Sequence, residues 1–135
     1  MMAHASGDKG LCRAFRDGLD IHAQTAEGIF GIPPKDQDES RHRLPAKTTG
    51  FGIIMGISAV GLSESLTKYG QPRSVEECET LIQKWLALYP GVYAYQQAQR
   101  QTALREGAVR DHFGRRYWLA HVWAANAKIA EHALR

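Results

Sequence analysis

Four residues spaced four apart could together bind an anionic ligand that also carries a flat ring. They are Arg43, Lys47, Phe51 and Met55. Each step of four residues along an α-helix advances by only about 40° around the axis, so all four would share one face. Arginine binds phosphate oxygens through paired hydrogen bonds, and lysine acts as a compact positive charge. This order of two cations, a ring and a thioether suits a nucleotide. The cations would contact its phosphates, and the ring and the thioether would contact its sugar and base.

Pro45 indicates where this helix starts, and we predict a helix from about Arg43 to Met55. Proline lacks an N–H and is tolerated in the first turn of a helix. Arg43 and Lys47 would then lie where free N–H groups and the helix dipole already favour anions. The alternative is a basic amphipathic helix on a solvated surface, because four-apart charge patterns are common there. Spacing alone leaves both interpretations open.

Short helices are predicted on both sides of this segment. Their ranges are 9–17, 21–30 after an Asp20 cap, 58–69, 74–88 with a Ser74–Glu77 capping box, 90–106, and 124–134. Residues 35–42 are charged and polar, which indicates a loop or short helix. Residues 108–119 contain a Phe-Gly break before Tyr-Trp-Leu, which favours a small hairpin. The predicted fold class is mainly α with one short β-hairpin.

Composition restricts the function less than the helix pattern does. The chain has 135 residues, 44% of them hydrophobic, and a formal net charge of +3, which fits one domain with a modest core. Such a mild charge does not by itself indicate a nucleic-acid partner. Cys12 and Cys78 lack any metal-ligand or disulfide pattern, so we expect two buried, reduced thiols in a cytosolic protein. No apolar run approaches the roughly 20 residues that span a bilayer, so no membrane partner is expected.

Residues 43–56 resemble the nucleotide-binding helix of family A DNA polymerases, the DNA polymerase I-like enzymes of bacteria and their phages. The shared pattern is Arg-x-x-x-Lys-x-x-x-Phe-Gly-Ile-Ile-x-Gly. Segments 3–8 and 20–26 resemble the stretch after the first catalytic motif of these enzymes, and 89–92 and 113–116 resemble the return from fingers to palm. The resemblance implies part of a right-hand polymerase domain. Its divisions would be 1–18 at the palm edge, 19–90 in the fingers subdomain and 91–135 in the fingers-to-palm return.

The resemblance also implies a role for each candidate site residue. His22, Arg43 and Lys47 would bind the triphosphate of the incoming dNTP. Lys47 would in addition donate a proton to the departing pyrophosphate, which makes it the candidate catalytic residue. Phe51 would stack against the sugar and base of the nucleotide. Positioned cations suit this chemistry because phosphoryl transfer develops negative charge on the leaving group.

A second set of residues is implied to contact primer–template DNA. Met55 and Gly56 would lie on the template side, although family members commonly carry Tyr at the Met55 position. Arg115 and Arg116 would contact the DNA backbone, which positions DNA without reading its sequence. The alternative for the two arginines is a solvated pair on the hairpin.

The metal chemistry of such enzymes is expected to lie outside these residues. Family A polymerases use two Mg²⁺ ions held by two aspartates, in motifs that would fall before residue 1 and beyond residue 135. No metal ligand is therefore predicted here, and the 135 residues alone are expected to be inactive. The parent would be a cytoplasmic DNA-directed DNA polymerase of a bacterium or phage-infected cell. The rival hypothesis is a stand-alone, non-catalytic helical module that binds nucleic acid.

Overall fold

The computed structural model describes residues 2–111 and 113–119, and this part of the chain is mainly α-helical with one β-hairpin, as predicted. The helices are α1 (Met2–Ser6), α2 (Lys9–Arg16), α3 (Ile21–Phe30), α4 (Leu44–Ile54), α5 (Ala59–Lys68), α6 (Val75–Leu88) and α7 (Pro90–Glu106). A 3₁₀ turn, η1 (Pro34–Asp36), and a π-helical turn, η2 (Glu39–Arg43), lie between α3 and α4. The strands β1 (Ala108–Arg110) and β2 (Arg116–Trp118) pair antiparallel. The helix predicted over 124–134 lies outside the described residues.

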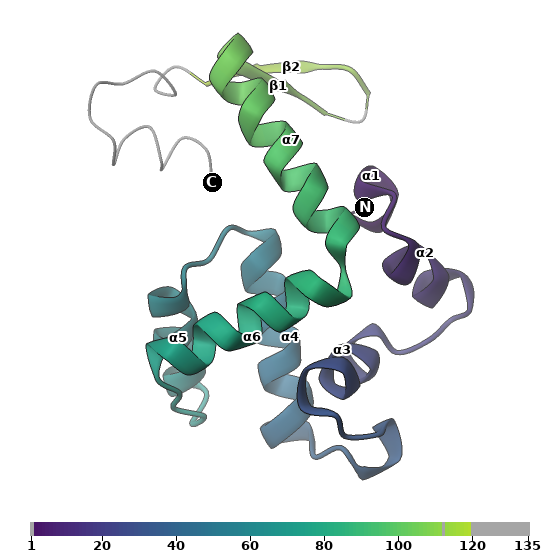
Figure 1. The fold of residues 1–135 in the computed structure, drawn as a ribbon, viewed down its shortest axis with the longest axis vertical. Helices are drawn as coiled ribbons and strands as arrows, with labels where there is room; N and C mark the ends of the chain where they lie inside the picture. Colours follow the sequence, from purple (N-terminus) through teal and green to yellow (C-terminus); the bar gives the residue numbers. More distant parts are fainter. Residues whose placement is uncertain (1, 112, 120–135) are drawn as a thin grey trace.

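The helices form two groups joined by the long helix α7 (Figure 1). Helices α3, α4, α5 and α6 pack on one another, and α7 leads away from the end of α6 to the hairpin. Helix α1 packs against α7, and α2 lies between α1 and α3. None of the described helices is both long and apolar enough to cross a membrane.

Short polar residues set most of the helix starts. The side chains of Asp8, Asp20, Ser58 and Ser74 each accept a backbone N–H at the start of α2, α3, α5 and α6. The Asp20 cap and the Ser74–Glu77 capping box are confirmed. Helices α3 and α7 end at Gly31 and Gly107, whose left-handed backbone suits glycine. Helix α1 was not predicted.

The core lies where α5, α6 and α7 meet α3 and α4. Its most buried large side chains include Leu62, Leu66, Cys78 and Val92, and Trp85 and Tyr89 pack ring to ring at 4.9 Å between centroids. Cys78 is buried and reduced, as expected. Cys12 is also reduced but, contrary to expectation, only partly buried; its Sγ donates to the carbonyl oxygen of Ala3 on α1 at 3.2 Å.

Asp8 connects the N-terminal helices to the start of α7. Its side chain is only 3% exposed; Oδ1 accepts the amide of Leu11 at 3.0 Å, and Oδ2 accepts the amide of Gly91 at 2.8 Å. A Cβ added to Gly91 would lie 2.8 Å from the Cα of Asp8, which is too close for a real contact. Glycine at position 91 therefore permits the approach that this carboxylate stabilises.

Replacing Asp8 by Ala should lower the free energy of unfolding by about 2–4 kcal/mol. The variant loses an N-cap and leaves the partly buried amide of Gly91 without its acceptor. Urea unfolding followed by circular dichroism measures the change. Glu79→Ala, at an exposed position of α6, is the control. Equal stability of the two variants would contradict the structural role given to Asp8.

Candidate functional site

The predicted nucleotide-binding residues gather where α3, η2 and α4 meet. Helices α3 and α4 lie against each other, and η2 contacts both. The ring of His22, on α3, lies 5.9 Å from the ring of Phe51, on α4. Arg43, at the end of η2, reaches the start of α3, and the charge of Lys47 acts on His22. The structure therefore brings together the four residues that the sequence singled out for nucleotide binding.

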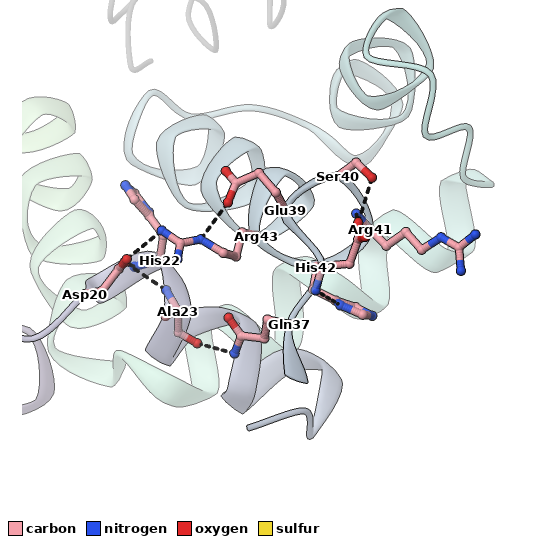
Figure 2. Close-up of polar contacts among 10 residues, drawn as sticks. Asp20, His22, Ala23, Gln37, Glu39, Ser40, Arg41, His42 and Arg43 are labelled. Atoms are coloured by element: carbon pink, nitrogen blue, oxygen red, sulfur yellow. Dashed lines mark hydrogen bonds and ion pairs between the residues drawn. The ribbon is translucent and has the colours of Figure 1, made fainter. Parts of the chain in front are cut away.

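Arg43 is held by two carboxylates (Figure 2). Its Nη2 donates to Oδ2 of Asp20 at 2.6 Å. Its Nε lies 2.9 Å from Oε2 of Glu39, in an ion pair that lacks the geometry of a hydrogen bond. The Arg43 side chain remains 34% exposed. The guanidinium is thus partly exposed, with its Nε buried from solvent, and is neutralised within the chain.

Asp20 is the more firmly held of the two carboxylates. Its Oδ1 accepts the amides of His22 at 2.9 Å and Ala23 at 3.0 Å, which caps α3. The hydrogen bond from the Ala23 amide lowers the pKa of Asp20 most, and the positive charge of Arg43 lowers it further. Asp20 is therefore ionised at neutral pH and fixed in position by backbone donors.

The expectation of free backbone N–H groups beside Arg43 is wrong. Helix α4 does begin at Leu44 with Pro45 in its first turn, but η2 runs directly into it. The amide of Arg43 bonds to the Asp38 carbonyl, and that of Leu44 bonds to the Glu39 carbonyl. The preceding turn therefore takes up two of the donors that a free helix start would offer to an anion, which leaves more of the positive charge to side chains.

Asp38 and His42 fix the shape of this preceding turn. Oδ1 of Asp38 accepts the amide of Arg41 at 2.8 Å, and Nδ1 of His42 accepts the amide of Asp38 at 2.9 Å. The ring of His42 lies 5.8 Å from that of Phe30. Gln37 ties the loop to α3 by donating to the Ala23 carbonyl at 2.8 Å. These contacts set where Arg43 leaves the turn.

His22 is half-buried between charges of both signs. Burial lowers its pKa most, the negative charge of Asp20 opposes this, and the positive charges of Lys47 and Arg43 lower it further. The net pKa lies below 6.5, so the imidazole is neutral at neutral pH. A neutral imidazole still offers one N–H to a phosphate oxygen.

The exposed face of α4 carries Lys47 and Phe51, and Met55 follows at its end. Lys47 is exposed, and Phe51 and Met55 are 57% and 75% exposed. The opposite face is packed by Pro45, Ala46, Thr49 and Ile53. Phe51 is therefore available to a ligand and is not a core residue. Gly56 follows the helix with a φ of 77°, which turns the chain toward α5.

Arg115 and Arg116 lie apart from this cluster, on the hairpin at the far end of α7 (Figure 1). Nε of Arg115 donates to Asp111 at 2.6 Å, and its guanidinium lies 5.5 Å from the ring centre of Phe113. The guanidinium of Arg116 lies 5.0 Å from the ring centre of Trp118. Both arginines are exposed and stacked on aromatic rings, so they form a second surface.

Two further features bear on the site. Sequence reasoning missed that Asp20 and Glu39 contact Arg43; the four-residue spacing of Glu39 and Arg43 could have indicated one pair, but nothing local indicates the other. Among the described residues, no three His, Cys, Asp or Glu side chains lie close enough to hold a metal ion.

Comparisons with known proteins agree with the resemblance seen in the sequence. The model of DNA polymerase family A matches residues 1–135. DNA polymerase I of Pseudomonas aeruginosa is 38% identical over 135 residues, which are 100% of this chain and 14% of that protein. DNA polymerase I of Chloroflexus aurantiacus is 39% identical over 130 residues, covering 96% of this chain and 13% of that protein. The chain thus spans about one seventh of these relatives.

A solved structure supports the fold. The polymerase domain of Pol1 from M. smegmatis, in complex with DNA primer-template and dNTP, matches with a TM-score of 0.86 and 29% identity. The match covers 98% of this chain and 22% of that one.

The imidazole of His22 should titrate below 6.5 in the folded chain, because burial and two nearby cations disfavour its charged form. The folded state then binds fewer protons than the unfolded state, so the stability from His22 is complete above pH 6.5 and falls as the pH drops toward the folded pKa. NMR titration of the ring protons, assigned with His22→Gln, measures the midpoint. A midpoint at or above 6.5 would contradict this environment.

Proposed function

The chain belongs to DNA polymerase family A, and we propose that its α3–α4 surface binds the triphosphate of an incoming dNTP during template-directed DNA synthesis. The observation that carries this proposal is the convergence of His22, Arg43 and Lys47 beside the exposed ring of Phe51. Three potential donors to phosphate oxygens and one stacking ring therefore lie together where α3, η2 and α4 meet.

Each residue has a distinct part in the proposed binding. Arg43 binds phosphate oxygens through its guanidinium fork, and His22 donates one N–H from its neutral ring. The ring of Phe51, 57% exposed, stacks on the sugar and base. These contacts fix the triphosphate so that its reacting phosphorus is held in place.

Lys47 is the proposed catalytic residue. Its exposed ammonium lies on the same face of α4 as Phe51. As the bond to the leaving pyrophosphate breaks, negative charge grows on that group, and a nearby ammonium stabilises the charge and can deliver a proton to it. In line with the family resemblance, the two aspartates that hold the Mg²⁺ ions of such a polymerase would belong to motifs outside these 135 residues.

The other divisions of the chain follow from the same proposal. Residues 19–90 form the fingers, with 1–18 at the palm edge and 91–135 returning to the palm. Met55 and Gly56, at the end of α4, face the template, and the hairpin arginines contact the primer–template backbone. The rival, a stand-alone helical module that binds nucleic acid, predicts DNA binding without any use of dNTP.

Arg43→Ala and Lys47→Ala should each cost about 2–4 kcal/mol of transition-state stabilisation, or about 30–900-fold in kcat/KM for dNTP. The test is a chimera in which residues 1–135 replace the matching segment of the Pseudomonas aeruginosa enzyme. Lys68→Ala, which removes an exposed cation at the end of α5, is the control. Values within twofold of the parent chimera for both site variants would refute the assignment.

The double variant Arg115→Ala, Arg116→Ala should weaken binding of primer–template DNA by a similar factor for every sequence. It should also lower the slope of log K against log salt by about one for each lost phosphate contact. The same chimera can be measured by fluorescence anisotropy over a range of salt concentrations. Arg13→Ala removes an exposed, acid-paired arginine of α2 and serves as the control. An unchanged slope would indicate that the hairpin arginines only face solvent.

A further inference from the structure

The two carboxylates on Arg43 are held in different ways. Asp20 has one oxygen on Arg43 and the other fixed by the amides of His22 and Ala23. Glu39 is 79% exposed and meets Arg43 only through an ion pair of poor hydrogen-bond geometry. One acid is therefore built into the start of α3, and the other is a loosely held side chain at the surface.

We propose that Asp20 anchors Arg43 and that Glu39 is an exchangeable carboxylate, which occupies the guanidinium until a triphosphate displaces it. This inference rests on the proposed function of the α3–α4 surface. It assigns a positioning role to Asp20 and a competing role to Glu39.

The geometry supports this division of roles. A guanidinium has five N–H donors in one plane, and Asp20 accepts a hydrogen bond from one nitrogen, Nη2. The Glu39 carboxylate lies at Nε, on an edge that phosphate oxygens also use. An exposed ion pair contributes little stability, so exchanging Glu39 for a phosphate has a low cost. Asp20 stays in place because backbone amides hold it, and it keeps Arg43 directed at the surface shared with His22 and Lys47.

Opposite effects on triphosphate affinity distinguish this arrangement from simple repulsion. Removing the charge of Glu39 frees the guanidinium edge and should strengthen binding. Replacing Asp20 by Asn keeps an oxygen that can cap α3 but no longer holds Arg43, so binding should weaken. If both acids only repelled the phosphates, both substitutions would strengthen binding.

The test measures the affinity of the full 135-residue chain for dGTP with Mg²⁺ by isothermal titration calorimetry at pH 7.5. Glu39→Gln should lower Kd about threefold and Asp20→Asn should raise it about threefold, which is the size of effect that exposed ion pairs have. Glu27→Gln, an equal charge change at an exposed position of α3, should leave Kd unchanged. Circular dichroism confirms that each variant is folded.

A double-mutant cycle with Arg43→Met shows whether Glu39 acts through Arg43. The effect of Glu39→Gln should disappear when Arg43 is absent. Equal tightening in both backgrounds, or tightening by Asp20→Asn, overturns the exchange. If Arg43→Met weakens dGTP binding but Glu39→Gln leaves Kd unchanged, the proposed nucleotide site stands and only the exchange of Glu39 is refuted. Failure of the wild type and of Glu39→Gln to bind dGTP overturns both proposals.

Discussion

The site depends on the Asp20 carboxylate, which performs two structural tasks at once. One oxygen accepts two amides at the start of α3, and the other accepts Nη2 of Arg43. The first contact determines where α3 begins and so where His22 points; the second fixes the end of η2 and so the start of α4. A single charged group thus links the two helices that carry the candidate ligand contacts, which also pack directly on each other.

Packing on the far side of α4 allows its near side to remain open. Thr49 and Ala46 are almost completely buried, and Ile53 lies in the core cluster, so α4 is held by one face. The other face can then expose Phe51 and Met55, side chains that a protein would ordinarily bury. The ring of Phe51, exposed on a well-packed helix beside cations, is one reason for proposing this surface as a ligand site.

Local signals in the sequence predicted the element boundaries, because caps and left-handed glycines act within a few residues. Asp20, the Ser74–Glu77 box and Gly107 all do what their spacing indicates. Helix α1 was missed, since it is held by packing on α7. The short turns η1 and η2 lie where a loop or short helix was predicted. The shared face of α4 came from spacing, whereas the role of each residue came from the family resemblance. The pair of Asp20 and Arg43 spans 23 residues, and no local pattern indicates it.

The acids around Arg43 reduce the electrostatic repulsion among the cations on this surface. Cations gathered on one surface repel one another, and this repulsion opposes folding when no ligand is bound. Asp20 and Glu39 neutralise Arg43, and Asp20 also offsets part of the effect of Lys47 and Arg43 on His22. His22 lowers the cost further by remaining neutral. The surface is therefore close to balanced in charge without a ligand, and in the proposed exchange Arg43 would give up Glu39 for a phosphate while keeping its contact with Asp20.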